Sequence, residues 1–109
     1  MKRGSVVVMV APGDLGKPRP AIVVQAEGFG DNPLTTLVCP ISSHIVGTQR
    51  IRPVVEPSTK NGLRVRSQIM IDKLIALRTD RIRQTIGAVE EEVSEQLDRA
   101  LLLVLGLAR

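Results

Sequence analysis

The sequence predicts a mainly β domain of the α+β kind, in which a small antiparallel barrel or strongly curled sheet precedes one C-terminal α-helix. Two observations predict this class: short β-branched segments bounded by Gly and Pro fill most of the chain, and the clear helical period comes last. The 109 residues contain no internal repeat or linker, so we expect residues 1–109 to form one domain. Its core must be aliphatic, because Phe29 is the only Phe, Tyr or Trp.

The first half of the chain alternates strand and loop signals. Residues 5–10 are rich in Val and end at a Pro-Gly turn, and residues 21–25 are nearly all apolar, as in a strand buried on both faces. Between them, residues 11–20 hold three prolines and two glycines and are expected to form a loop. Further strands are expected at residues 34–41, 51–55, 68–72, 74–77 and 82–86.

Two details refine this pattern. Pro53 suggests that the strand at 51–55 lies at a sheet edge, because proline cannot donate a ladder hydrogen bond. The Asn61-Gly62 pair favours a tight hairpin turn before the strand at 68–72.

Residues 90–105 are predicted to form the helix. Apolar residues recur every three or four positions, glutamates occupy the first turn, where they suit the exposed N–H groups, and Gly106 follows the end. Leu102, Leu103 and Leu105 widen the apolar surface beyond one stripe. We expect this surface to pack on the sheet; an oligomer interface is the alternative.

Charge is unevenly distributed. Residues 90–109 carry a net charge of −3 and residues 1–89 one of +7, so the body of the domain should attract polyanions such as RNA or DNA. A merely soluble basic surface is the alternative. Binding by stacking successive bases on aromatic side chains is disfavoured, since the chain has one such ring.

The cysteine count and the lengths of the apolar segments exclude disulfide-stabilised, zinc-binding, secreted and membrane-spanning proteins. The lone Cys39 excludes an internal disulfide and a cysteine-rich zinc site, and with one His44 no metal site is expected. The apolar segment after Met1–Arg3 is too short for a secretion signal, and no stretch approaches the roughly 20 apolar residues of a membrane span. We therefore expect a cytoplasmic protein with no membrane association.

Three blocks resemble one known family in order and spacing, across essentially the whole chain. Lys2–Gly4 precedes a strand, a Pro/Gly loop and the block Arg19–Val24; Cys39–Ser43 forms a second block. The third consists of Gly62-Leu63, Ser67, Asp72-Lys73, Gly87, the acid-rich helix and Leu105–Leu107. This pattern resembles the MazF/PemK-type toxins of toxin–antitoxin systems.

The resemblance implies an SH3-like, CcdB/PemK-like barrel that forms a homodimer. It implies a type II toxin, an endoribonuclease or mRNA interferase that uses no metal or other cofactor. Such a protein cuts single-stranded RNA at short sequences by attack of the ribose 2′-OH and so inhibits translation and growth. The implied partner is an antitoxin whose acidic, initially disordered segment covers the RNA groove.

The resemblance also implies roles for individual residues. Arg19, held between Pro18 and Pro20, is expected to stabilise charge on the phosphate, since a guanidinium binds two phosphate oxygens and stays protonated. Ser42 takes the place of a catalytic Thr; a turn residue at a strand end is the alternative. Residues expected to contact RNA are Lys17, Ser43, Ser67 and Lys73.

The general base is left open between two carboxylates. Asp72 matches an acid that some PemK-like relatives use as the base, although an ion pair with Lys73 would make it structural. Asp14 in the first loop is the other candidate. His44 has the right ionisation range for proton transfer but has no family counterpart, so a surface or turn histidine is expected.

Two other functions remain open. A CcdB-like protein would poison DNA gyrase without cutting RNA, but such chains carry a Trp near the C-terminus, and this chain has none. A basic barrel that binds nucleic acid without cleaving it would keep its RNA affinity after Arg19→Ala.

Overall fold

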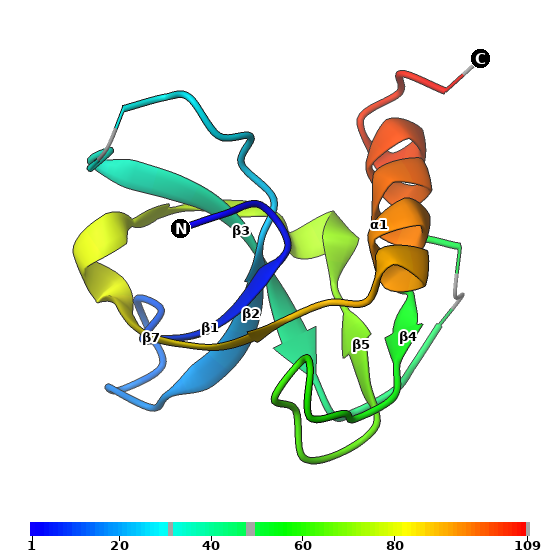
Figure 1. The fold of residues 1–109 in the computed structure, drawn as a ribbon, viewed down its shortest axis with the longest axis horizontal. Helices are drawn as coiled ribbons and strands as arrows, with labels where there is room; N and C mark the ends of the chain where they lie inside the picture. The colour runs from blue at the N-terminus through cyan, green and yellow to red at the C-terminus, as the bar shows by residue number, and fades with distance from the viewer. Residues whose placement is uncertain (31, 48–49, 109) are drawn as a thin grey trace.

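The strands form one antiparallel sheet that curls into a half-barrel, with one helix beside it (Figure 1). The computed structural model describes residues 1–30, 32–47 and 50–108. Its strands are β1 (Ser5–Met9), β2 (Arg19–Val23), β3 (Thr35–Ser42), β4 (Val54–Val55), β5 (Ser67–Ile69), β6 (Ile75–Arg78) and β7 (Ile82–Ala88). They follow the order β4-β5-β3-β2-β1-β7, and β6 also pairs with β3. The predicted fold class is confirmed.

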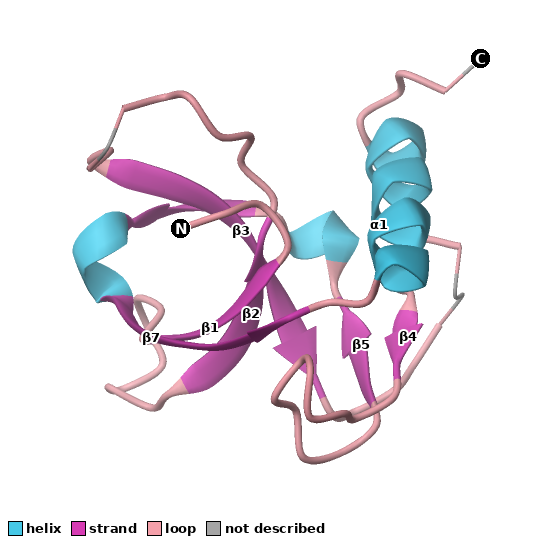
Figure 2. Ribbon diagram, viewed as in Figure 1, coloured by secondary structure: helices cyan, strands magenta, loops and turns pink. Residues whose placement is uncertain are grey.

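Among the described residues, helical structure is confined to one α-helix and two short 3-10 helices (Figure 2). The 3-10 helix η1 (Ile71–Lys73) follows β5, and η2 (Thr79–Arg81) joins β6 to β7. The α-helix α1 (Glu91–Val104) begins one residue after the predicted start. Among the described residues, no helix is long and apolar enough to cross a membrane.

The sheet is buried on both faces at its centre, which explains the unbroken apolar sequence of the central strands. On one side, Val6 and Ile22 pack with residues of η1 and α1. On the other, Val7 and Met9 pack against β3 and β6. The first two predicted strands are confirmed, and β2 is the element whose two neighbours, β1 and β3, fix its position.

The predicted loop 11–20 is wrong at its C-terminal end. Arg19 and Pro20 are the first residues of β2, because they pair with Met9 and Val8 of β1. Pro20 is tolerated at the start of a strand, where a missing N–H costs least. Arg19 therefore extends from the sheet itself, and the first loop is shorter than expected.

The predicted tight hairpin at Asn61-Gly62 is also wrong. β4 and β5 are paired, but residues 56–66 connect them in a long loop, and Asn61 is completely buried within it. The Asn61 side chain supplies hydrogen bonds to the backbone of this loop: its Oδ1 accepts from the N–H groups of Ser58 and Leu63 at 3.1 and 2.9 Å. Its Nδ2 donates to the carbonyl oxygen of Glu56 at 2.9 Å.

The start of α1 is tied to this loop. Glu90, which precedes the helix, accepts hydrogen bonds from Ser58 Oγ at 2.6 Å and from Asn61 Nδ2 at 3.2 Å. The Ser58 hydrogen bond is the main reason why the pKa of Glu90 is lowered. The carboxylate thus joins the loop to the end of β7.

Other segments differ in length from their predictions. The strand predicted at 51–55 is reduced to Val54–Val55, which lies at the sheet edge as Pro53 suggested. The segment 68–72 leaves the sheet after Ile69, because Ile71–Lys73 turn into η1. Asp31 in the predicted connector and Arg109 in the acidic tail lie outside the described residues.

The C-terminal half of α1 is more exposed than predicted. Only Leu97 and Ala100 are buried in the helix, whereas Leu102 and Leu103 are 45% and 39% exposed. Gly106, with φ at +73°, ends the helix: its N–H donates to Leu103 and that of Leu107 donates to Leu102. The predicted packing on the sheet is confirmed, through Leu97 and Ala100, but it covers only part of the apolar surface.

Gly87 is predicted to be indispensable for stability. A Cβ at this position would lie 2.7 Å from the carbonyl oxygen of Asn61 and closer still to that of Lys60. We expect Gly87→Ala to lower the free energy of unfolding by about 3 kcal/mol, because the atoms that a new Cβ would meet belong to the backbone of Lys60 and Asn61 and cannot move aside as a flexible side chain could. Urea unfolding measures this effect.

Gly106→Ala is the matched control. Gly106 has a positive φ but open space around a new Cβ, so only the cost of the left-handed conformation, about 1 kcal/mol, should appear. Equal effects of the two substitutions would contradict the close approach of residues 60–61 to Gly87.

Candidate active site

A groove of about 1050 Å³ lies between the start of β2, the end of β3, the loop after Gly62 and η1. We call it the Arg19 groove. Of the residues predicted to act on RNA, it brings together Arg19, Ser42, Ser43, Ser67, Lys73 and Asp14. Lys17 and Asp72 are not among the described residues that line it.

Arg19 enters the groove from the first position of β2. Its backbone is fixed by pairing with Met9. The pairing of β2 with β3 begins two residues later, at Ala21↔Pro40, so the start of β2 and the end of β3 lie at the same end of the sheet. The side chain is 47% exposed, and its Nε lies 3.6 Å from Asp14 Oδ2. The guanidinium is therefore accessible to an anion while a loose carboxylate contact orients it.

Ser42 occupies the last position of β3. Its Oγ accepts a hydrogen bond from the backbone N–H of His44 at 3.1 Å, so it does form the strand-end turn considered as the alternative. The only acceptor near its own proton among the described residues is the His44 carbonyl, at a long 3.5 Å. A hydroxyl whose oxygen is already engaged in this way keeps its O–H available for a phosphate oxygen.

Lys73 and Asp72 point to different sides of η1, as consecutive residues of a 3-10 helix do. Lys73 lines the Arg19 groove. Asp72 instead pairs with Arg52 in a two-pronged contact, with Oδ1 3.0 Å from Nε and Oδ2 2.9 Å from Nη2. The ion pair considered for Asp72 exists, but its partner is Arg52 and not Lys73.

The Arg52 pair changes the chemistry available to Asp72. The Arg52 hydrogen bonds are the main reason why the pKa of Asp72 is lowered, and the same contact raises the pKa of Arg52. A carboxylate with a lowered pKa is a weaker proton acceptor. The Asp72 side chain thus points away from the groove, and its pairing with Arg52 makes it a weaker base.

Ser67 and Lys17 differ from the other predicted RNA contacts. Ser67 is 3% exposed, and its Oγ donates to the carbonyl oxygen of Val65 at 2.9 Å. Its hydroxyl proton is therefore used to shape the loop that forms one wall of the groove. Lys17 lies in the first loop, where its backbone N–H donates to the carbonyl oxygen of Asp14.

Three groove residues were not predicted to have a role. Arg64 adds a third cationic side chain beside Arg19 and Lys73, and Gln84 of β7 supplies an amide. His44, expected to be a surface or turn residue, is exposed in a turn and also lines the groove. No local sequence signal marks them, because their proximity depends on how the sheet curls.

Cys39 lies in the interior, away from this chemistry. It is fully buried on β3, and burial is the main reason why the pKa of its thiol is raised to about 12. A thiol held in this state is a poor nucleophile. Among the described residues, no three His, Cys, Asp or Glu side chains form a group that could hold a metal ion.

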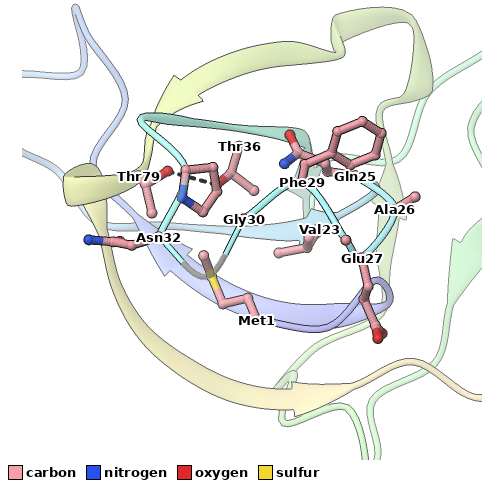
Figure 3. A pocket seen from close by; sticks show the side chains of 12 residues that line it. Met1, Val23, Gln25, Ala26, Glu27, Phe29, Gly30, Asn32, Thr36 and Thr79 are labelled. Atoms are coloured by element: carbon pink, nitrogen blue, oxygen red, sulfur yellow. Dashed lines mark hydrogen bonds between the residues drawn. The ribbon is translucent and has the colours of Figure 1, made fainter.

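A second hollow, of about 390 Å³, lies under the loop after β2 (Figure 3). Thr36 and Thr79 join their hydroxyls at 2.8 Å along one side of it. Glu27 extends away from the other labelled side chains in this view, and Phe29 is 70% exposed. None of the predicted site residues is among the described residues that line it.

Known proteins resemble the whole chain. It is 32% identical over 109 residues to a protein of Mycolicibacterium smegmatis named "Probable endoribonuclease MazF", covering 99% of both chains. A solved endoribonuclease in complex with its cognate antitoxin, from a mycobacterial species, superposes with a TM-score of 0.82 at 18% identity, covering 100% of this chain and 98% of the other.

A MazE–MazF structure from Deinococcus radiodurans superposes with a TM-score of 0.77 at 16% identity, covering 99% and 98% of the two chains. These structures share the fold of this chain. Residues 2–105 match the family described as "PemK-like, MazF-like toxin of type II toxin-antitoxin system". This match disfavours the CcdB-like alternative and confirms the resemblance seen in the sequence. The chain belongs to the PemK-like, MazF-like toxins.

Proposed function

We propose that this chain is the toxin of a type II toxin–antitoxin system and acts as a metal-independent endoribonuclease on single-stranded RNA. The observation that carries the proposal is the Arg19 groove, where Arg19, Arg64 and Lys73 face one carboxylate, Asp14. This excess of positive charge suits a polyanion. The name of the relative from M. smegmatis supports the same activity.

The proposed reaction is transfer of the phosphate from the 5′ oxygen of one nucleotide to the 2′ oxygen of its neighbour. The 2′ oxygen attacks phosphorus, the bond to the 5′ oxygen breaks, and the products are a 2′,3′-cyclic phosphate and a 5′-OH. Three needs follow: negative charge on the phosphate must be stabilised, the 2′-OH proton must be removed, and the leaving 5′ oxygen must gain a proton, which water can supply.

Arg19 and Ser42 meet the first need in this proposal. The Arg19 guanidinium binds non-bridging phosphate oxygens, and Ser42 donates its hydroxyl to the same phosphate. Lys73 and Ser43, which line the groove beside them, bind flanking phosphates. Ser67 acts through the loop at Val65, and contact of Lys17 with RNA stays a prediction.

Asp72 and Asp14 are the carboxylates considered for the second need. The ion pair with Arg52 supports a positioning role for Asp72, because it ties the segment that carries Arg52 to η1. Asp14 is better placed, in the groove, but its contact with Arg19 engages the same carboxylate. The role of Asp72 as the base therefore stays a sequence-based prediction, with a test given below.

The partners follow from the surfaces. An acidic antitoxin segment fits the cationic groove, and solved relatives include complexes with an antitoxin. The exposed apolar end of α1, at Leu102, Leu103 and Leu105, supports a homodimer. We infer a cytoplasmic location, where RNA is available.

Arg19→Ala is expected to abolish RNA cleavage and growth inhibition. Loss of one charge-stabilising donor typically costs about 100- to 1,000-fold in rate. Purified protein is incubated with a long RNA and EDTA, and cut sites and end groups are mapped. The unmodified chain should leave 2′,3′-cyclic phosphate and 5′-OH ends.

Arg66→Ala is the matched control, because Arg66 pairs with Glu56 on the surface and lies outside the groove lining. It should cleave normally. An active Arg19→Ala protein would remove Arg19 from the mechanism. If neither protein cleaves and both bind RNA, the chain is a binding module.

Asp72→Asn is expected to destabilise the fold in a pH-dependent way. The lowered pKa means that the contribution of the ionised pair is fully present above the ordinary value of 3.8 and is lost as pH falls through the lowered pKa. The difference in unfolding free energy between the two proteins should shrink as pH falls from 5 toward 2. Urea unfolding at several pH values measures it.

The same variant tests the base hypothesis. A positioning role predicts a loss of cleavage rate of less than about tenfold, since a partly exposed ion pair contributes on the order of 1 kcal/mol. The shape of the pH–rate profile should stay unchanged. A loss above about 100-fold together with a lost pH dependence would instead identify Asp72 as the base.

A further inference from the structure

The proposed reaction lacks a good proton acceptor among the predicted site residues. A guanidinium is a poor proton acceptor, so Arg19 does not suit this role. Asp72 is paired with Arg52 and points away from the groove, and Asp14 is paired with Arg19. The group that takes the 2′-OH proton is therefore expected among the groove residues that have no assigned role.

Among the described residues that line the groove, His44 carries an imidazole, the side-chain type that most often serves as a general acid or base in enzymes. It follows Ser42 by two positions, and its backbone N–H donates to Ser42 Oγ at 3.1 Å. The residue is exposed, so its imidazole is open to a ligand in the groove. A phosphate bound between Arg19 and Ser42 would thus lie close to the turn that carries His44.

The backbone around His44 is held firmly by a buried amide. Gln68 of β5 is completely buried and pairs with Ser42 of β3. Its Oε1 accepts from the backbone N–H of Val46 at 2.8 Å, and its Nε2 donates to the carbonyl oxygen of Arg52 at 3.1 Å. His44 therefore lies between two fixed points, Ser42 and Val46.

Charged groups face the groove from each element around His44. Arg19 comes from β2, Asp14 from the first loop, Arg64 from the loop after Gly62 and Lys73 from η1. As residue types, arginine and lysine do not ordinarily change charge between pH 5 and 8, whereas histidine does. A change of cleavage rate between pH 5 and 8 would consequently not come from the arginine and lysine side chains.

We propose that His44 is the general base of the reaction. This inference rests on the proposed ribonuclease activity. An imidazole nitrogen of His44 accepts the 2′-OH proton as the 2′ oxygen bonds to phosphorus, and Arg19 stabilises the phosphate charge. The bond to the 5′ oxygen breaks, water protonates that oxygen, and the imidazolium returns its proton to solvent.

The test compares His44→Asn and His44→Gln with the unmodified chain in single-turnover cleavage of a defined RNA between pH 5 and 9. General-base catalysis is worth about 100- to 10,000-fold, so both variants should cleave that much more slowly at neutral pH. The unmodified rate should rise tenfold per pH unit at the acidic end and then level off, and the variants should lose this rise.

Two further readouts separate chemistry from structure. RNA affinity of both His44 variants, measured by fluorescence anisotropy with an uncleavable 2′-deoxy analogue, should change less than about threefold. Added imidazole should restore part of the cleavage by His44→Ala, since a free base can replace the missing one. Arg64→Gln is the matched groove control: it should weaken RNA binding but keep the increase of cleavage rate with pH at the acidic end.

Each outcome bears on one claim. If the unmodified chain cleaves and the His44 variants keep both the cleavage rate and its increase with pH at the acidic end, the base assignment is overturned while the proposed function stands. A slower rate explained wholly by weaker RNA binding also overturns it. If the unmodified chain leaves the RNA intact, both proposals fail.

Discussion

The Arg19 groove depends on how β2 is held between β1 and β3. Arg19 is the first residue of β2, and its backbone is fixed on one side by pairing with Met9. On the other side the strand is buried against β3, where Ala21 lies opposite Pro40. A strand buried on both faces cannot slip by one residue without exposing its apolar side chains. Packing of the interior therefore determines where the guanidinium enters the groove.

The segments on the opposite side of the groove are held in place by hydrogen bonds from buried side-chain amides, where a regular strand would use backbone hydrogen bonds. Asn61 and Gln68 are both completely buried; the Asn61 amide binds backbone groups of the loop 56–66, and the Gln68 amide binds those of Val46 and Arg52. Gly87 allows the loop 56–66 to approach the sheet closely. Such loops can present charged and polar side chains to a ligand while their backbone stays fixed, which is the combination that a catalytic surface needs.

Most of the fold could be predicted from local sequence patterns, because apolar periodicity and Gly or Pro punctuation are local signals. The errors occurred where a distant residue decided the structure. Asn61-Gly62 has the composition of a tight turn, yet burial of the Asn61 amide and its bonds to the surrounding loop favoured a long connection. Pairing with β1 extended β2 backward to Arg19, against the proline content of that segment.

The site was predictable in part for the same reason. Arg19 and Ser42 were found through the family blocks that contain them, and the sheet register brings their strands together. The Arg52 partner of Asp72 lies 20 positions earlier and carries no local signal. The place of His44 in the groove follows from the turn at the end of β3 and the bond between Val46 and Gln68.

The central claim is that one phosphate of a bound RNA sits between β2 and the end of β3. A crystal structure of the chain with a short RNA that carries a 2′-deoxy substitution at the cleaved nucleotide tests it most directly. The account predicts non-bridging oxygens of that phosphate within hydrogen-bond distance of the Arg19 guanidinium and of Ser42 Oγ. An RNA bound along another face, with Arg19 facing solvent, would contradict it.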